Sequence, residues 1–352
     1  MRDKICMGLL IILLTGSLSL VSFSSSGSEG TRLPVDSSAY KLIPLNLNSS
    51  VMEDDTYQST FFTAMGGLNM NTFTTDADWL TWELTDARPM NMSGIAAQWN
   101  FDTGDASDSS GNQNDGFLHG TSSVSGISSN SEALSFDGDD YVDIPHSQTL
   151  NITDEITLEA WIYPTIDDLD EYMIISKGGS WSNEDPQCYE LTIDDARPLF
   201  QMKLPDSEDW YGAAPSEPIT METWHHVAGV YDGSLFRIYI DGVNQTNIYN
   251  GWGGTYKGKV YNGGLPTGDF NISIGRRSPA SWGSLFYEGY IDDVRIWDRA
   301  IPESEMIQHS VIPGSKFLNL TGIPDNGDVG ENDVWINVTD NDGRYDEFEF
   351  TI

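Results

Sequence analysis

Hydrophobic and polar positions alternate along most of the chain in short runs, separated by Gly, Asn, Asp and Pro. Runs of this kind that are rich in β-branched and aromatic residues are typical of strands, and Asp-Gly pairs such as Asp232-Gly233 are typical of the tight turns between them. Strands are expected at Ala133–Phe136, Ile156–Ile162, Tyr189–Ile193, Leu199–Lys203, His225–Tyr231, Phe236–Ile240, Asn271–Ile274 and Ile291–Trp297. This spacing predicts an all-β fold, a sandwich or jelly roll.

One helix is expected in this pattern, at 302–309. Pro302 stands early, where a missing N–H costs nothing, and Glu303 and Glu305 lie in the first turn, where acidic groups favour the helix dipole. The pattern therefore predicts a single short helix in an otherwise all-β chain.

The N-terminal segment differs from the rest of the chain. Arg2 and Lys4 precede an apolar core at 7–21, and a run of small residues follows at 22–28. This order is typical of a secretory signal peptide, and the core is short for a membrane span of about 20 residues. We expect residues 1–28 to be a leader and the protein to be secreted or at the cell surface, with an uncleaved N-terminal anchor as the alternative.

Composition narrows the range of partners. The formal net charge is −37, from 54 acidic and 17 basic residues, which disfavours nucleic acid and anionic membrane surfaces. Aromatic residues make up 11% of the chain, which argues against disorder. Once the leader is removed, Cys188 is the single cysteine and is expected to be a small buried side chain. Glycosylation sequons stand at Asn48, Asn91, Asn151, Asn244, Asn271, Asn319 and Asn337, as in a glycan-decorated exported protein.

A series of motifs between Ala96 and Val311 carries a family resemblance. They are WNFDTGDASDSSGNQNDGFLHG (99–120), LSFDGDDYVDIP (134–145), LNITDEITLEAWIYP (150–164), IISKGG (174–179), TWHHVAGVYDGSLFRIYIDGV (223–243), SIGRR (273–277) and YIDDVRIWDRAIPESEM (290–306). In this order and spacing they resemble the laminin-G-like family of concanavalin A-like proteins. The resemblance implies a jelly-roll sandwich.

The segments on either side resemble the two halves of an Ig/cadherin-like module, on Glu53–Tyr57 and Ala77–Leu80 in the first and on Leu320–Gly330 and Val334–Gly343 in the second. Neither is long enough for a complete sandwich of about 100 residues. We predict that the jelly roll is inserted into this domain and splits it, because insertion at a surface loop is tolerated; two unrelated decorations are the alternative. The expected organisation is a leader at 1–28, a linker at 29–44, a first Ig-like half at 45–95, the jelly roll at 96–311 and a second half at 312–352.

Acidic turns in the jelly roll favour calcium. Asp and Asn in Gly-rich turns supply the six to eight oxygens that this hard cation requires, and they gather at 102–115, 137–140 and 292–293. The resemblance implies a structural calcium held by an early loop and a late strand. The expected ligands are Asp108, Asn112, Asp137 and Asp292. The alternative is a set of Asx turns without a metal.

Aromatic, Gly-rich loops are the candidate ligand-binding segments. A jelly roll usually binds carbohydrate, with aromatic rings against the sugar and polar groups on its hydroxyls. The loop at 249–266 is favoured because Gly lets the backbone approach a ligand closely. The predicted ligand-binding residues are Trp252, Tyr256, Trp181, Trp210 and Trp282. Local packing of each ring is the alternative.

Catalytic motifs are missing from the sequence. The resemblance implies a Glu-x-Asp-x-x-Glu strand for retaining hydrolases of this sandwich, and none occurs. The acids at 184–190 come closest, but their spacing does not fit one face of a strand, and Glu159 is interpreted as a surface residue without a partner. His225 and His226 are expected to pack and hydrogen-bond at a strand start, because no Ser, Cys or second metal-ligand motif accompanies them.

We therefore predict a secreted or cell-surface binding module that is not an enzyme. It would recognise an extracellular glycan or a cell-surface protein, in carbohydrate recognition or adhesion, with calcium as a structural ion. Two alternatives stay open, a scaffold protein of the cell envelope that mediates protein contacts and a hydrolase-related protein without a recognisable catalytic motif. The aromatic loops favour the glycan-binding or adhesive module over the scaffold protein.

Overall fold

The chain folds as two units, residues 89–310 in one and residues 1–88 with 311–352 in the other. The computed structural model describes residues 42–46, 57–63, 69–75, 80–86, 90–128, 131–165, 171–178, 187–204, 210–245, 260–277, 285–311, 316–322, 333–339 and 345–351. Within these ranges no helix is long and apolar enough to cross a membrane.

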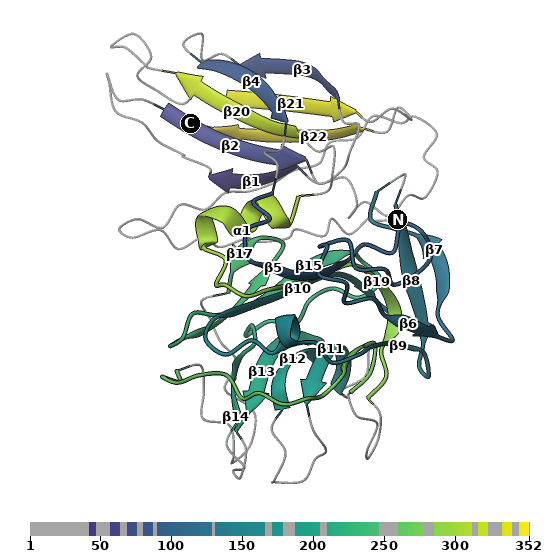
Figure 1. Cartoon of the computed structure of the whole chain (residues 1–352). Helices are drawn as coiled ribbons and strands as arrows, with labels where there is room; N and C mark the ends of the chain where they lie inside the picture. Colours follow the sequence, from purple (N-terminus) through teal and green to yellow (C-terminus); the bar gives the residue numbers. More distant parts are fainter. Residues whose placement is uncertain are drawn as a thin grey trace. The chain divides into compact units, whose positions relative to one another are not determined.

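The unit at 89–310 consists of two antiparallel sheets that face each other (Figure 1). The eight-stranded sheet has the order β17 (Val243–Asn244), β16 (Phe236–Ile240), β15 (His225–Tyr231), β10 (Ile156–Pro164), β19 (Glu288–Trp297), β8 (Glu132–Asp137) and β7 (Ser122–Ser125), with β5 (Ile95–Trp99) paired to β19. The seven-stranded sheet has the order β14 (Trp210–Ala213), β13 (Arg197–Lys203), β12 (Gln187–Asp194), β11 (Glu171–Gly178), β18 (Ile272–Ile274), β9 (Tyr141–Ile144) and β6 (Phe117–His119). The predicted all-β sandwich of jelly-roll type is confirmed.

Strand periodicity places the core between these sheets. Along β10, Leu158, Ala160 and Ile162 belong to the core cluster, so the residues between them face the other side of the sheet. Cys188 on β12 lies in the same core, and burial raises the pKa of its thiol to about 12. The cysteine is a buried apolar side chain, as predicted.

A helix covers part of the outer face of the eight-stranded sheet. It is α1 (Glu303–His309), which begins after Pro302 and carries acids in its first turn, as the sequence predicts. Met306 of α1 packs in one cluster with Trp297 of β19 and with Val230 and Ala228 of β15, two strands of that sheet. The 3-10 helix η2 (Gln148–Leu150) is the other short helix of the described residues.

The second unit is built from strands on both sides of the jelly roll in sequence. One sheet has the order β1 (Leu42–Asn46), β2 (Tyr57–Thr63), β20 (Lys316–Gly322) and β4 (Leu80–Asp86), and the other has β22 (Tyr345–Thr351), β21 (Asp333–Thr339) and β3 (Asn69–Thr75). β20 therefore lies between two strands from the first segment, and β21 pairs with β3. An insertion into one domain requires pairing of this kind. The Ig-like identity of that domain and its boundaries stay predictions.

Candidate functional site

The outer face of the seven-stranded sheet carries polar side chains. Leu191 of β12 points into the core, so Glu190 and Thr192 beside it lie on the opposite face. Gln201 of β13 pairs with Glu190 on one side, and Ser176 of β11 pairs with it on the other. All four polar side chains are buried, so their hydrogen-bonding needs cannot be met by bulk water.

Arg277, which follows β18, lies between two carboxylates on this face. Its Nε is 3.2 Å from Oε1 of Glu190, and its Nη2 is 3.1 Å from Oε2 of Glu171 and 3.3 Å from Oε2 of Glu190. Gln201 Nε2 donates to the same carboxylates, at 2.9 Å to Glu171 and 3.3 Å to Glu190. Ser176 Oγ donates to Glu190 at 3.2 Å. We call these five residues the Arg277 cluster.

The two carboxylates of the Arg277 cluster differ in their access to solvent. The side chain of Glu190 is fully buried, whereas that of Glu171 is 23% exposed. Burial raises the pKa of Glu171 to about 7; Arg277 acts in the opposite direction, and the charges of Glu190 and Asp194 add to the rise. Glu171 is therefore the carboxylate of the cluster that exchanges a proton with solvent near neutral pH.

Two hydroxyl groups on this face lack a hydrogen-bond partner. Thr192 Oγ1 and Ser273 Oγ are buried and make no hydrogen bond with the residues that the structure describes. Ser273 of β18 is paired with Ser176, which brings it next to the Arg277 cluster. An unmet buried hydroxyl costs about 1–3 kcal/mol. The face therefore contains two fully buried hydroxyl groups whose hydrogen bonds are not met among the described residues.

Sequence reasoning missed the pairing of Glu171 with Glu190. Spacing along one strand relates the acids at 184–190 only to one another, whereas the partner of Glu190 comes from the neighbouring strand. The β11–β12 pairing contains irregularities between Met173 and Ile175 and between Lys177 and Gly178. Such shifts change which residues share a face, and no residue spacing in the sequence announces them.

The acidic turn between β8 and β9 is the best cation-binding candidate among the described residues. Oxygens of Asp137, Asp139 and Asp140 lie within 4.8 Å of one another. Asp137 and Asp139 are exposed, and Asp140 Oδ2 accepts the backbone N–H of Asp137 at 3.1 Å. Burial raises the pKa of Asp140, and the charges of its two acidic neighbours add to the rise. Crowded carboxylates of this kind fit a hard divalent cation.

Asp108 and Asn112 lie together in the 102–115 loop, apart from that turn. The Asp108 carboxylate accepts three backbone N–H groups, at 2.8 to 3.0 Å. The Asn112 amide donates to the carbonyl groups of Ile95 and Ala96 at 3.0 and 3.1 Å. These contacts hold the loop through Asx-type hydrogen bonds, the alternative that the sequence left open. Calcium binding by these two residues stays a prediction.

Asp292 occupies a third location, on β19. It is buried, and its Oδ2 accepts the backbone N–H of Ile127 at 3.1 Å. Burial raises the pKa of Asp292 to about 8, and the charge of neighbouring Asp293 adds to the rise. With no cation bound, this carboxyl is largely protonated at neutral pH. Within the described residues, Asp292 is not part of a three-acid group. The four predicted metal ligands thus occupy three separate places.

Of the predicted ligand-binding aromatic residues, Trp210 falls within the described part of the chain. It begins β14, is half-buried and pairs with Lys203 of β13, at one end of the seven-stranded sheet. The other four lie outside the described residues: Trp252, Tyr256, Trp181 and Trp282. Ligand binding by all five stays a prediction.

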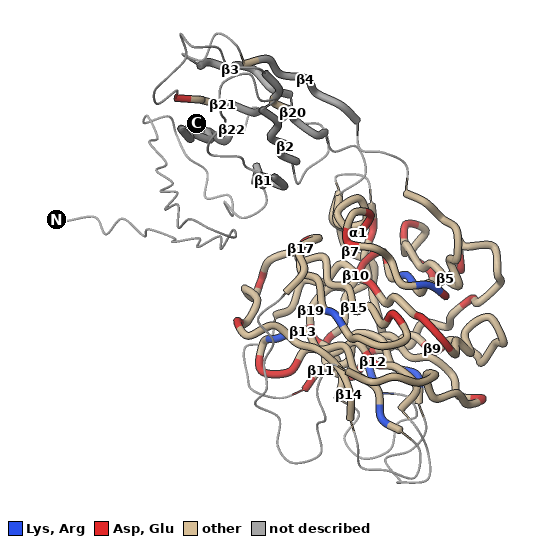
Figure 2. Tube along the Cα trace, turned by 90° about the vertical axis from the view of Figure 1, so that its left-hand side faces the viewer, with Lys and Arg blue, Asp and Glu red and all other residues tan. Residues whose placement is uncertain are grey.

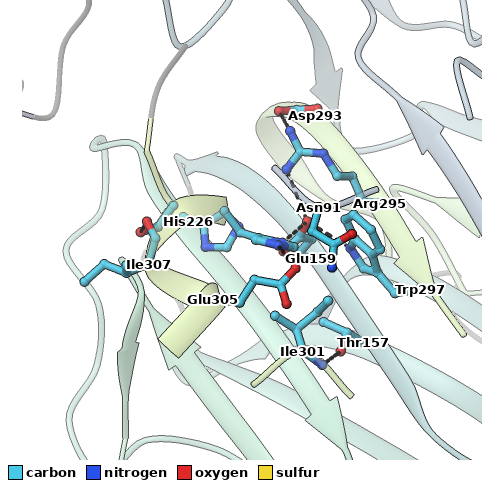
Figure 3. Close-up of polar contacts among 12 residues, drawn as sticks. Asn91, Thr157, Glu159, His226, Asp293, Arg295, Trp297, Ile301, Glu305 and Ile307 are labelled. Carbon is cyan, nitrogen blue, oxygen red and sulfur yellow. Dashed lines mark hydrogen bonds and ion pairs between the residues drawn. The ribbon is translucent and has the colours of Figure 1, made fainter. Parts of the chain in front are cut away.

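Glu159 is the centre of a buried polar network beneath α1 (Figure 3). Its Oε1 accepts from Trp297 Nε1 at 3.0 Å and from Arg295 Nη1 at 3.1 Å. His309 Nδ1 of α1 lies 3.0 Å from Oε2, and His226 Nε2 lies 3.5 Å from the same oxygen. The interpretation of Glu159 as a surface residue was wrong, because α1 covers that side of β10. We call these five residues the Glu159 network.

The Glu159 network is charged and closed to solvent. Burial alone would raise the pKa of Glu159, but the charge of His309, the contacts of His226 and His309 and the charge of Arg295 outweigh it and hold the pKa well below its usual value. His309 and His226 are buried, so the network does not offer a surface to a ligand. His226 packs against Trp161 there, but neither of its ring nitrogens makes a hydrogen bond with a described residue, so the predicted hydrogen bond is not found, and a structural role of His226 stays a prediction.

Three solved structures resemble the chain at low similarity. Domain 4 of AbnA, a GH43 extracellular arabinanase from Geobacillus stearothermophilus in complex with arabinotriose, is 18% identical with a TM-score of 0.45, over 61% of this chain and 98% of that domain. The botulinum neurotoxin serotype D ligand binding domain in complex with N-acetylneuraminic acid is 14% identical with a TM-score of 0.46, over 62% and 52%. A mutant of Trypanosoma rangeli sialidase displaying trans-sialidase activity is 16% identical with a TM-score of 0.44, over 64% and 34%. The chain thus spans about half of the toxin domain and a third of the sialidase.

A family model adds to the observed fold. No curated protein matches the sequence. Residues 136–306 match a laminin-G-type model described as the concanavalin A-like lectin/glucanases superfamily. The match confirms the resemblance drawn from the motifs within these residues. The segment at 136–306 is therefore a laminin-G-like jelly roll of the concanavalin A-like superfamily.

Proposed function

We propose that the jelly roll is a non-catalytic carbohydrate-binding module of a secreted or cell-surface protein, and that sugar binds at the outer face of the seven-stranded sheet. The unmet hydroxyl groups of Thr192 and Ser273, next to the Arg277 cluster, carry this proposal. Sugar hydroxyls both donate and accept hydrogen bonds, so they can form hydrogen bonds with hydroxyl, amide and carboxylate groups at the same site. The leader that the sequence predicts at 1–28 supports export.

The state of Glu190 supports binding rather than hydrolysis. A retaining glycosidase needs one carboxylate free to attack and a second that carries a proton, about 5–5.5 Å apart. Glu190 is fully buried, and its oxygens already accept from Ser176, Gln201 and Arg277. An attack by Glu190 would break these contacts. A reducing-end assay on the oligosaccharides that bind tests this point, since release of sugar would contradict it.

A structural calcium ion forms part of the proposal, with Asp137, Asp139 and Asp140 as the ligand group. Their mutual approach supports it, because carboxylates held within 4.8 Å of one another repel unless a cation or protons lie between them. Calorimetric melting at several calcium concentrations, with chelator as the reference, is the test. An unchanged melting temperature in wild type removes calcium from the proposal.

Thr192→Val is the sharpest test of the sugar site. Replacing an unpartnered hydroxyl by a methyl group of the same shape removes an unmet polar group, so the free protein should keep or gain stability. Sugar affinity should fall about 3- to 10-fold, because one ligand hydrogen bond is lost. Oligosaccharides selected on a glycan array would be titrated calorimetrically against both proteins.

Thr121→Val is the matched control for that substitution. Thr121 Oγ1 is also buried without a partner, but it lies in the connection between β6 and β7 rather than on the outer face of the sheet. Thr121→Val should leave the affinity for sugar unchanged. Equal effects of the two substitutions on binding, or no effect of Thr192→Val, would move the sugar away from this face.

A further inference from the structure

Among the described residues, Arg276 pairs with no acid, although the protein is strongly acidic. The other five described arginines each form an ion pair with Asp or Glu: Arg197, Arg237, Arg277, Arg295 and Arg299. Within the part of the chain that the structure describes, Arg276 makes no hydrogen bond or ion pair, and its Nε is buried without a partner. Acidic residues occur throughout the described part of this unit (Figure 2), so scarcity of acids does not explain the missing partner.

An aromatic side chain holds the Arg276 guanidinium in place. The guanidinium carbon lies 3.4 Å from the centroid of the Tyr141 ring, a cation–π contact. His119 stacks on Tyr141 with ring centroids 4.2 Å apart and planes 12° apart, and Phe286 approaches Tyr141 at 6.4 Å. The contact with Tyr141 orients the charged group without neutralising it, so it remains available to an anion.

Exposed rings lie beside this charge. Phe117 and His119 are two residues apart on edge strand β6 and pair with Asp143 and Tyr141 of β9. Because alternate residues of a strand share a face, both rings project on the same side of the sheet as Tyr141. Phe117 is 61% exposed, and His119 is exposed as well. Ring faces of this kind accept the apolar side of a sugar.

We propose that Arg276 binds the acidic group, carboxylate or sulfate, of an acidic sugar held at this edge of the seven-stranded sheet. A planar guanidinium without a partner forms paired, charge-assisted hydrogen bonds with such a group. The net charge of the whole protein does not prevent this, because ions at 0.15 M screen charges beyond about 8 Å. The inference rests on the proposed sugar-binding function and names the class of sugar.

Matched ligands and matched variants test the inference. Calorimetric titrations would compare oligogalacturonides and 6-sulfated galactosides with neutral galacto-oligosaccharides of the same length. Wild type should bind at least one acidic ligand about 10- to 100-fold more tightly than its neutral counterpart, and Arg276→Gln should abolish that difference. Arg237→Gln, which removes an arginine paired with Asp232, should preserve it.

Each outcome has a separate meaning. Equal binding of acidic and neutral ligands by wild type, or a preference that survives in Arg276→Gln, overturns the role of Arg276 and leaves the sugar-binding function standing. Failure of all ligands and of a wider glycan array to bind removes the function itself. The Nε–H resonance of Arg276 can be followed by NMR in wild type, without any variant. It should shift on addition of the acidic ligand and not of the neutral one. An unshifted resonance overturns the inference even if the variant fails to fold.

Discussion

Replacement of Glu159 by Gln perturbs the centre of the buried network beneath α1. Gln keeps the size of the side chain but removes its negative charge and places an NH2 group among donors. Arg295 Nη1, Trp297 Nε1 and His309 Nδ1 all point at the carboxylate from 3.0 to 3.1 Å. At least one of these donors would lose its acceptor in a site with no access to water.

The expected cost follows from burial. Removing one partner of a fully buried ion pair destabilises a protein by about 3–5 kcal/mol, since the remaining charge has neither partner nor solvent. Arg295 retains its contact with Asp293, which places the expectation at the lower end of that range. For a unit of this size the loss corresponds to a fall of roughly 6–12 °C in melting temperature.

The assay must resolve the jelly roll from the second unit, because a single thermal transition would mix the two. Hydrogen exchange of the β10 and α1 amides reports on the jelly roll directly. The control is Glu288→Gln, the same chemical change at an exposed position of the same sheet, expected within about 0.5 kcal/mol of wild type. A loss below about 1 kcal/mol in Glu159→Gln would refute the reasoning from burial.

The sign of the pH dependence adds a second check on Glu159. Its pKa in the folded protein is lowered, so its contribution is present above the unfolded value and is lost as pH falls through the folded one. With an unfolded pKa of about 4.3, the difference between wild type and Glu159→Gln should be constant above pH 6. It should shrink at pH values below about 4. A difference that grows with acid would contradict the lowered pKa.

Three further predictions concern other sites. The pKa of Asp292 is raised to about 8, so wild type should lose stability as pH rises from about 4 to 8. Urea unfolding in the presence of chelator should therefore show Asp292→Asn to be more stable than wild type at pH 8.5 and similar to it at pH 4. A Cβ at Gly229 would lie 2.3 Å from the Phe200 ring, so Gly229→Ala should cost about 1–3 kcal/mol in the same assay. Glu171 titrates at about pH 7, so sugar affinity should change between pH 6 and 8 in wild type and not in Glu171→Gln, by calorimetry.

The sequence predicts elements whose pattern is local. Alternation at 156–162 gives both the strand and its inward residues, because the period of two is a property of that segment alone. Pro302 with its following acids gives α1 for the same reason. The environment of Glu159 is different, because its partners Arg295 and His309 lie 136 and 150 residues further along the chain. Alternation shows that Glu159 faces away from the core, but it cannot show that a helix covers that face.

Arg276 was missed for a related reason. Its neighbour Arg277 occurs in the same motif and looks equivalent in sequence, yet Arg277 forms ion pairs with Glu171 and Glu190 while Arg276 rests on Tyr141. The distinction depends on which face each side chain takes after β18. An arginine without an acid can be recognised only when the positions of all acids around it are known.

The two outer faces of the jelly roll differ in a way that bears on where a ligand binds. On the eight-stranded sheet, Met306 and His309 of α1 seal the surface, and the donors around Glu159 converge on its carboxylate. On the seven-stranded sheet, the hydroxyls of Thr192 and Ser273 lack a hydrogen-bond partner and Arg276 lacks an acidic partner among the described residues. Within the same residues, buried nitrogens without a hydrogen-bond partner also remain on the eight-stranded side, in His226, Arg295 and His309, so the contrast between the two faces lies in the cover that α1 provides and in the charge of Arg276. Two variants measure this difference between the faces. Thr192→Val should weaken sugar binding and leave the stability of the fold unchanged, whereas Glu159→Gln should lower the stability of the fold and leave the sugar site unchanged.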